Sequence, residues 1–187
     1  MMKKLGTRRL ETGRLILRRF TVGDAEDMYR NWASDLEVTR YLTWPCHVSS
    51  DATAELLAAW VEEYAEGDYF NWAIEFKETG RVIGSISVVK LDESVNAAEI
   101  GYCLSRAYWG RGIMPEALRS VMDYMFDEAE VNRLADYHDV NNPKSGRVMQ
   151  KAGMQYEGTH RQAGKNNQGI CDVACYAALR SDQRAKA

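Results

Sequence analysis

The sequence predicts one α/β (α+β) domain, built on a mixed, largely antiparallel sheet that is flanked by helices. Short runs in which apolar and polar residues alternate recur along the chain, as in half-buried strands. Longer stretches with apolar residues at helical spacing lie between them. Short turns rich in glycine and polar residues join neighbouring strand-like runs, as in hairpins. A length of 187 residues with 45% hydrophobic composition suits one core, so residues 1–187 are expected to form a single domain.

The first half of the chain is expected to hold a strand, two helices and a hairpin. RLILRRF (14–20) alternates as a strand does, and Thr21 or Asp24 then caps a helix over AEDMYRNWAS (25–34). A second helix starts at Ser49 or Ser50 and ends at Gly67. YFNWAIEF (69–76) and RVIGSISVVKL (81–91) form the hairpin around the turn KETG. The apolar stripe of the second helix comprises Leu56, Leu57, Trp60, Val61 and Tyr64.

The second half is expected to alternate strands and helices. Strands are predicted at 97–105 and 133–140, with a helix from Gly112 after the first and a helix closed by Gly153 after the second. Two last strands, 154–162 and 170–179, flank a loop AGKNNQG (163–169). Residues 1–10 and 181–187 are expected to be flexible ends. The helix from Gly112 should bury Leu118, Val121, Met122, Met125 and Phe126 and turn Ser120, Asp123, Tyr124 and Asp127 outward.

Composition excludes several classes of function. With 24 basic and 27 acidic residues, no overall field draws the chain to nucleic acid or an anionic membrane. No apolar run reaches the roughly 18 residues of a membrane helix, and MMKKLGTRRL lacks the apolar segment of a signal peptide, so a cytoplasmic location is expected. The cysteines (Cys46, Cys103, Cys171 and Cys175) have neither disulfide-scaffold nor zinc-site spacing, and the histidines are scattered, so no metal is expected.

Two glycines, Gly110 and Gly112, precede a predicted helix whose first turn contains Pro115. Proline is tolerated there because first-turn N–H groups have no intrahelical partner. Those free N–H groups and the positive end of the helix dipole suit a phosphate or pyrophosphate. A simple tight turn is the competing interpretation. Pro115 stands where a dinucleotide motif needs glycine, and no Gly-Lys-Ser/Thr follows for a triphosphate loop.

Three stretches together resemble the GNAT superfamily of N-acetyltransferases, in its RimJ/RimL-like branch. AEIGYCLSRAYWGRGIMPEAL resembles the acyl-coenzyme A binding segment, with its Gln/Arg-x-x-Gly-x-Gly/Ala signature. NNPKSGRVMQKAGMQYEG resembles the branch's Asn-x-x-Ser, Lys-x-Gly-Met/Phe and Glu-Gly pattern, and ETGRLILRRF its first strand. The resemblance runs from about Thr12 to Leu179. It departs at the signature's first position, where Ala107 stands, with Arg106 one place early.

The resemblance implies acetyl-coenzyme A (acetyl-CoA) as donor and a primary amine as acceptor. It implies that the strands ending near Leu104 and Asp139 splay apart around the pantetheine arm. The Arg111 side chain either adds charge to the cofactor site or is only solvated. The implied cofactor contacts are the main chain near Cys103, Leu104 and Ser105, the cradle of Gly110, Arg111, Gly112, Ile113 and Met114, and Asn142.

Direct attack by an amine on a thioester needs no enzyme nucleophile, only proton transfers and stabilisation of the oxyanion. From the resemblance, Glu99 is the expected base, acting through water; the alternative is an exposed strand carboxylate. Ser145 is the expected proton donor to the thiolate, ahead of three tyrosines, although Asn142 and Ser145 also suit helix caps. A bulge near Ile100 or Gly101 is expected to hold the acetyl oxygen. The lower-ranked tyrosines are Tyr102, Tyr108 and Tyr156.

The acceptor is expected to bind in segments that precede the cofactor region. Trp44 and His47, in the loop RYLTWPCHVSS between the first two predicted helices, are the candidate acceptor residues; packing of that loop onto the sheet is the alternative. The resemblance favours the N-terminal α-amine of a ribosomal-type protein. A small amine (a polyamine or an aminoglycoside) and a non-catalytic acyl-CoA sensor are the alternatives, and homodimerisation stays open.

Overall fold

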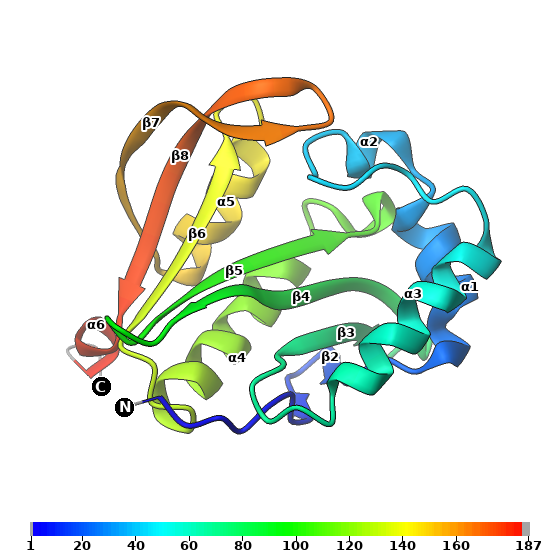
Figure 1. Cartoon of the computed structure of the whole chain (residues 1–187), viewed down its shortest axis with the longest axis horizontal. Coiled ribbons are helices and arrows are strands. Elements are labelled where there is room, and N and C mark those ends of the chain that lie inside the picture. Colours follow the sequence, from blue (N-terminus) through cyan, green and yellow to red (C-terminus); the bar gives the residue numbers. More distant parts are fainter. Residues whose placement is uncertain (1, 185–187) are drawn as a thin grey trace.

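The computed structural model describes residues 2–184. Within this range eight strands form one sheet in the order β1-β2-β3-β4-β5-β6-β8-β7, and β5–β6 is the parallel pair among antiparallel neighbours (Figure 1). This confirms the predicted mixed, largely antiparallel sheet. The strands are β1 Leu10–Glu11, β2 Leu15–Arg18, β3 Asn71–Phe76, β4 Arg81–Asp92, β5 Ala97–Leu104, β6 Arg133–Asp139, β7 Gln155–Asn166 and β8 Gly169–Leu179.

Helices cover both faces of the sheet. The helices are α1 Ala25–Met28, α2 Leu36–Thr39, α3 Ser50–Glu63, α4 Ile113–Asp127, α5 Pro143–Ala152 and α6 Arg180–Arg184. The predicted helix over 25–34 is one α turn followed by a π-helical turn, Tyr29–Ala33. Ser49 caps α3, because its side chain accepts the N–H of Ala52 at 3.1 Å. No helix in residues 2–184 has the length and apolarity needed to cross a bilayer.

Two hydrophobic clusters correspond to the two faces. The first joins α4 and α5 to one face of the sheet and includes Ile86, Ile100 and Leu118. The second joins α1, the π-helical turn and α3 to the opposite face and includes Trp32, Leu57 and Ala73. The side chains at the centre of both clusters are almost completely buried. The sheet therefore has a separate hydrophobic core on each of its two faces.

The central strands separate after a short paired stretch. β5 and β6 pair only through Ala97–Arg133, Ala98–Leu134 and Glu99–Ala135. Beyond Glu99, β5 stays with β4 and β6 stays with β8, so a gap opens between them (Figure 1). On β6, Gly146 of α5 packs so closely that a Cβ there would lie 2.5 Å from Nε2 of His138. The predicted splay of the central strands is confirmed.

Several local predictions were wrong for tertiary reasons. Tyr124 was expected to face outward but is only 3% exposed, because its hydroxyl donates to the Gly6 carbonyl at 2.7 Å. Val61, expected in the buried stripe of α3, is 39% exposed, and α3 ends at Glu63 rather than Gly67. The expected bulge at Ile100 or Gly101 lies on the partner strand, where Val89 of β4 is the extra residue.

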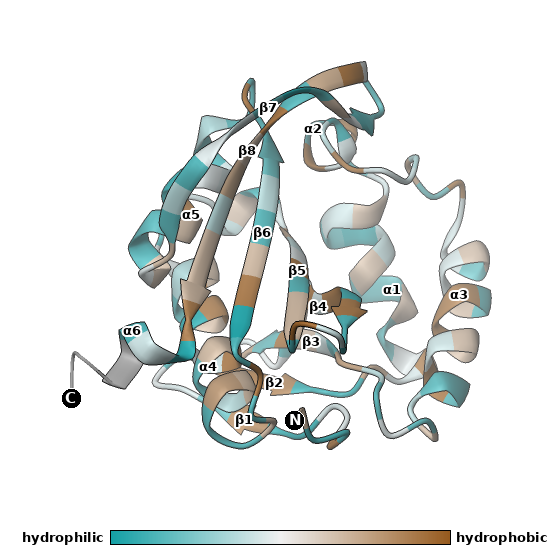
Figure 2. Cartoon of the chain, turned by 60° about the vertical axis from the view of Figure 1, so that its left-hand side comes forward, coloured by the Kyte–Doolittle hydropathy of each residue, from teal (hydrophilic) through white to brown (hydrophobic). Residues whose placement is uncertain are grey.

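The predicted loop 163–169 is mostly strand. β7 continues to Asn166 and β8 begins at Gly169, with an irregular register between His160 and Gly164. β7 is exposed over most of its length and is largely hydrophilic in Figure 2, so its sequence carries little apolar alternation. The polar sequence therefore looked like a loop although β8 holds it in the sheet.

The chain start is tied to the body of the protein. Lys3 donates its N–H to Ala129, and Thr7 is buried with its hydroxyl on the Tyr69 carbonyl. The Arg8 carbonyl accepts the indole N–H of Trp72 at 2.7 Å. Flexible ends were expected at 1–10 and 181–187; of these, residue 1 and residues 185–187 lie outside the described residues, and α6 continues to Arg184.

Candidate active site

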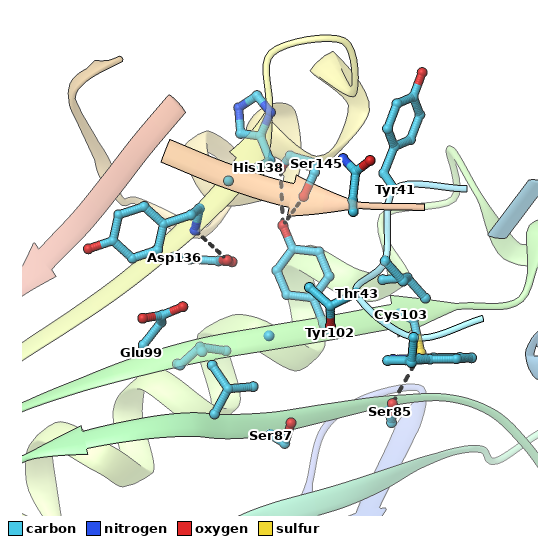
Figure 3. A pocket seen from close by; sticks show the side chains of 18 of the residues that line it. Tyr41, Thr43, Ser85, Ser87, Glu99, Tyr102, Cys103, Asp136, His138 and Ser145 are labelled. Atoms are coloured by element: carbon cyan, nitrogen blue, oxygen red, sulfur yellow. Dashed lines mark hydrogen bonds between the residues drawn. The ribbon is translucent and has the colours of Figure 1, made fainter. Parts of the chain in front are cut away.

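Two cavities meet at the gap between β5 and β6. The larger, of about 950 Å³, lies against β4 and β5 beneath α1, α3 and the β7–β8 hairpin. The smaller, of about 650 Å³, lies between α2, the start of α4 and the start of α5. Figure 3 shows the junction from close by. Six residues line both cavities: Tyr41, Leu42, Tyr102, Cys103, Asn142 and Ser145.

The smaller cavity contains the glycine-rich start of α4. Gly112 caps the helix with φ of 74°, a conformation that L side chains rarely adopt. Among the described residues, no carbonyl or side chain accepts the main-chain N–H groups of residues 111–114. Arg14 braces the segment, with Nη1 on the Arg111 carbonyl at 2.9 Å and Nε on Glu116 at 2.7 Å. This segment, the anion cradle, has the free N–H groups and the helix start that suit a phosphate.

A cation that follows α2 and three cations of α5 line the same cavity, and the sequence analysis did not assign them to the cofactor. Lys144 lies with Nζ 4.8 Å from the Trp109 ring centroid. The detectable signal was spacing, because Lys144, Arg147 and Lys151 share a helix face at intervals of three and four residues. A coenzyme with a pyrophosphate and further phosphate groups fits this cradle and these charges. The lining cations are Arg40, Lys144, Arg147 and Lys151.

Some predicted cofactor contacts line the smaller cavity and others do not. Arg111 is exposed and stacks on Phe76 and Tyr108, with its guanidinium carbon 5.6 and 5.1 Å from the ring centroids. Ser105 is buried and lines neither cavity; its N–H donates to Ile83 at 2.8 Å. The predicted residues that do line it are Cys103, Leu104, Gly110, Gly112, Ile113, Met114 and Asn142.

The main chain of β5 offers a free edge to the gap. The Ser105 N–H bonds to Ile83 of the β4 side, and successive residues of a strand direct their main-chain groups to opposite sides. Tyr102 and Leu104 therefore face the gap, whereas Cys103 and Ser105 face β4. The Leu104 carbonyl also accepts the indole N–H of Trp109 at 2.8 Å. Of the three predicted main-chain contacts, Leu104 is the one whose groups point toward the gap.

Glu99 lines the larger cavity, where its side chain rises from β5 (Figure 3). Burial raises the pKa of Glu99, and the charge of Lys90 partly opposes this. Trp44 and His47 line the same cavity. Their rings lie 5.3 Å apart, and Nδ1 of His47 lies 2.7 Å from the Thr53 hydroxyl. Burial lowers the pKa of His47, which favours the neutral ring.

Tyr102 and Ser145 bridge the gap at the cavity junction. The Tyr102 hydroxyl lies 3.0 Å from Oγ of Ser145 and donates to the Ser145 carbonyl at 3.1 Å. Burial raises the pKa of Tyr102, with a further contribution from Asp136, so the phenol stays protonated at neutral pH. The N–H of Ser145 donates to the Asn142 carbonyl, and the Asn142 side chain makes no cap bond to α5. The hydroxyl pair can donate a proton at the junction.

Asp136 is another residue that the sequence analysis did not single out. It lies on β6, is only 4% exposed and lines the larger cavity. Its Oδ1 accepts the N–H of Tyr137 at 2.7 Å, whereas Oδ2 has no hydrogen-bond partner among the described residues. Burial raises the pKa of Asp136 well above its usual value, and the charge of Glu99 raises it further.

The β7–β8 hairpin roofs the larger cavity. Asn167, at the tip, donates its main-chain N–H to Leu42, and its Nδ2 donates to the carbonyls of Thr39 and Trp44 at 2.8 Å each. Figure 1 shows the tip reaching across to the segment after α2. Across residues 2–184 no group of three or more His, Cys, Asp or Glu side chains could hold a metal ion.

A family profile described as an acetyltransferase (GNAT) domain matches residues 14–155. The chain belongs to this GNAT acetyltransferase family. YoaA of Bacillus subtilis (strain 168), an uncharacterized N-acetyltransferase, is 32% identical over 171 residues, which cover 91% of this chain and 96% of YoaA. The ribosomal-protein-serine acetyltransferase of Escherichia coli (strain K12) is 32% identical over 143 residues, 76% of this chain and 79% of that protein.

The fold of this GNAT protein also matches solved structures. The microcin C7 self-immunity acetyltransferase MccE, solved in complex with acetyl-CoA and AMP, superposes with a TM-score of 0.80 at 20% identity, over 90% of this chain and 93% of that one. Membership of the family makes the protein an acetyl-CoA-dependent N-acetyltransferase. The alternative of a non-catalytic sensor gains no support from these relatives.

Proposed function

We propose that the acceptor is the N-terminal α-amine of a protein of the ribosomal type. The observation that carries this is the junction of the two cavities, one with an anion cradle and one with Glu99 beside aromatic walls. An α-amine has a pKa near 7.7–8.0, against about 10.4 for lysine, so it needs only a weak base. A carboxyl whose pKa burial raises is suited to that task. The similarity to the E. coli ribosomal-protein-serine acetyltransferase supports the same class.

Each side chain has a defined task in this proposal. The cradle of residues 111–114 and the cations of α5 bind the coenzyme, and Tyr102 and Leu104 offer main-chain groups to its arm. Acetyl-CoA supplies the thioester carbonyl that the amine attacks. Glu99, directly or through water, accepts the proton of the acceptor ammonium, while Trp44 and His47 wall the amine's path. Ser145, backed by Tyr102, donates a proton to the departing sulfur.

A small amine is the second candidate, and the roof over the larger cavity favours it. Asn167 fastens the hairpin to the segment after α2, so the acceptor must fit beneath a closed arch. A volume of about 950 Å³ is in the range of small-molecule pockets. A polyamine or an aminoglycoside would fit this enclosure, and so would the first residues of an extended peptide.

Release of the coenzyme A thiol, measured against a matched panel, separates the two. One peptide carries a free α-amine and blocked lysines, a second has a blocked α-amine and free lysines, and spermidine and an aminoglycoside complete the set. The proposal expects turnover of the first peptide alone. Turnover of spermidine or the aminoglycoside, with both peptides inert, would instead establish the small-amine enzyme.

A further inference from the structure

Asp136 is a buried carboxyl with half of its hydrogen-bonding capacity unused. Oδ1 accepts the Tyr137 N–H, but no described residue donates to Oδ2. A buried polar atom without a partner is costly, and proteins keep few of them. Asp136 also lines the larger cavity, so the residue that carries this unpaired oxygen borders the space in which an acceptor would bind.

Glu99 lies near Asp136 where β5 and β6 begin to separate. Figure 3 shows the Glu99 side chain rising from β5 toward the Asp136 carboxyl, with the Tyr102 ring on the other side. The two carboxyls interact electrostatically, and neither forms an ion pair with any lysine, arginine or histidine in residues 2–184. Two carboxyls that share a site cannot both ionise cheaply unless a cation lies between them.

Asp139, at the end of the same strand, is a structural acid that can be compared with Asp136. Asp139 also lines the larger cavity, but Oδ1 accepts the main-chain N–H of Asn141 at 2.8 Å and Oδ2 accepts Nδ2 of Asn166, also at 2.8 Å. Both of its oxygens are therefore used within the protein. Asp136 differs because no described residue donates to its second oxygen.

We propose that Asp136 and Glu99 together form a two-carboxyl seat for the acceptor's ammonium group, with Oδ2 of Asp136 accepting one of its N–H bonds. The inference rests on an amine acceptor but not on which amine it is. The seated ammonium allows both carboxyls to ionise. One N–H proton then passes to Glu99, the freed nitrogen lone pair forms the N–C bond, and the C–S bond breaks, its electron pair leaving on sulfur. The thiolate takes a proton from Ser145, the second nitrogen proton leaves to solvent, Ser145 regains a proton from solvent, and Glu99 releases its proton to solvent.

The test variant is Asp136→Asn, which keeps the shape and an oxygen for the Tyr137 N–H. It mimics the protonated carboxyl, so the fold should persist. Burial raises the folded pKa of Asp136, so the ionised form destabilises the fold increasingly as pH rises from its unfolded pKa near 3.9 to its folded pKa. The melting temperature of the variant should therefore exceed that of wild type by more at pH 8 than at pH 5. Asp182→Asn is the matched control, because Asp182 also accepts a main-chain N–H, from Leu179, at the far end of the sheet.

The first readout is steady-state kinetics with whichever amine of the panel is turned over. Loss of one charged hydrogen bond should raise the KM for the amine about 10- to 100-fold and leave the KM for acetyl-CoA within about twofold. Asp182→Asn should change neither. An Asp136→Asn enzyme with unchanged amine KM, or with both KM values raised equally, would remove Asp136 from the seat while leaving the acceptor proposal intact.

The second readout needs no turnover. Carboxyl ¹³C resonances of Asp136 and Glu99 are titrated between pH 4 and 9, with and without n-butylammonium chloride, with n-butanol as the uncharged control. The groups around Asp136 in this titration are Glu99, Tyr102, Tyr137, His138 and Tyr176, with Lys90 beside Glu99. The ammonium should lower the Asp136 titration midpoint, and butanol should not. That result supports the seat even if no peptide is acetylated, and an Asp136 midpoint unmoved by butylammonium overturns it.

Discussion

The hydroxyls of Tyr102 and Ser145 lie 3.0 Å apart, joining β5 to α5 across the gap between the splayed strands. This contact lies where the two cavities meet, and it couples a phenol whose pKa is raised by burial to an aliphatic hydroxyl. If the Tyr102 hydroxyl turns its proton from the Ser145 carbonyl to Oγ, it can replace a proton that Ser145 has lost to a departing thiolate. The two hydroxyls are expected to work as one donor.

Tyr102→Phe and Ser145→Ala should each lower kcat by about 100-fold or more while the KM for acetyl-CoA changes little. The double variant should cost no more than the worse single variant, because the two hydroxyls form one relay. Pre-steady-state measurement of thiol release checks this in all three enzymes. Independent, multiplying losses would show that the hydroxyls act separately.

Glu99→Gln should remove the acid limb of the pH profile of kcat/KM. A base must be ionised, and burial raises the pKa of Glu99, so wild-type activity falls as pH drops through that raised pKa. Lys90→Gln is the informative partner. The Lys90 charge lowers the pKa of Glu99, so this variant should shift the limb to higher pH without abolishing activity. An acid limb that persists in Glu99→Gln would assign the base to another group.

Gly112→Ala should weaken acetyl-CoA binding beyond what its effect on stability explains. The new methyl group meets nothing closer than an Arg14 nitrogen at 3.7 Å, but φ of 74° is strained for alanine by about 1–2 kcal/mol. Gly80→Ala, at φ of 65° in the β3–β4 turn, is the matched control. Both should lower the melting temperature, and calorimetry should find weaker coenzyme A binding only for Gly112→Ala. Equal coenzyme A affinities of the two variants would show that the cradle does not bind the cofactor.

Asn167→Ala should loosen the roof of the larger cavity. It removes two hydrogen bonds, each worth about 0.5–1.5 kcal/mol, but keeps the main-chain bond to Leu42. Amide hydrogen exchange should accelerate in residues 39–44 and 163–169, and the KM for the amine should rise. Gln168→Ala, one residue along the same turn, is the control. Unchanged exchange rates would mean that the hairpin keeps its position without the two side-chain hydrogen bonds of Asn167.

Local sequence patterns were sufficient to predict the sheet, the start of α4 and α5. Strand alternation, Pro115 and Gly153 are signals that depend only on a few neighbouring residues. The inward turn of Tyr124 depended on Gly6, far away in the chain. β7 depended on pairing with β8, since its own sequence is polar. Tertiary contacts therefore explain most of the differences between prediction and structure.

The candidate site also has one part that local sequence predicts and one part that depends on tertiary contacts. The anion cradle is a local motif, and its glycines were found from sequence. Asp136 was missed because RLADYHDV is recognisable only as a strand, and nothing in its sequence shows that this carboxyl is buried. Its role arises only where β6 leaves β5, and that separation depends on three strands and α5 together. No pattern within one segment contains this information.

The position of the two cavities on different sides of the sheet has a consequence for the order of events. The donor reaches the junction past the starts of α4 and α5, while the acceptor arrives beneath the β7–β8 hairpin. Neither path crosses the other before the junction, so neither substrate has to wait for its partner, and each product can leave by the route its precursor used. We therefore expect random-order binding, in which spent coenzyme competes with fresh coenzyme and the acetylated product competes with free amine; product-inhibition kinetics would check this.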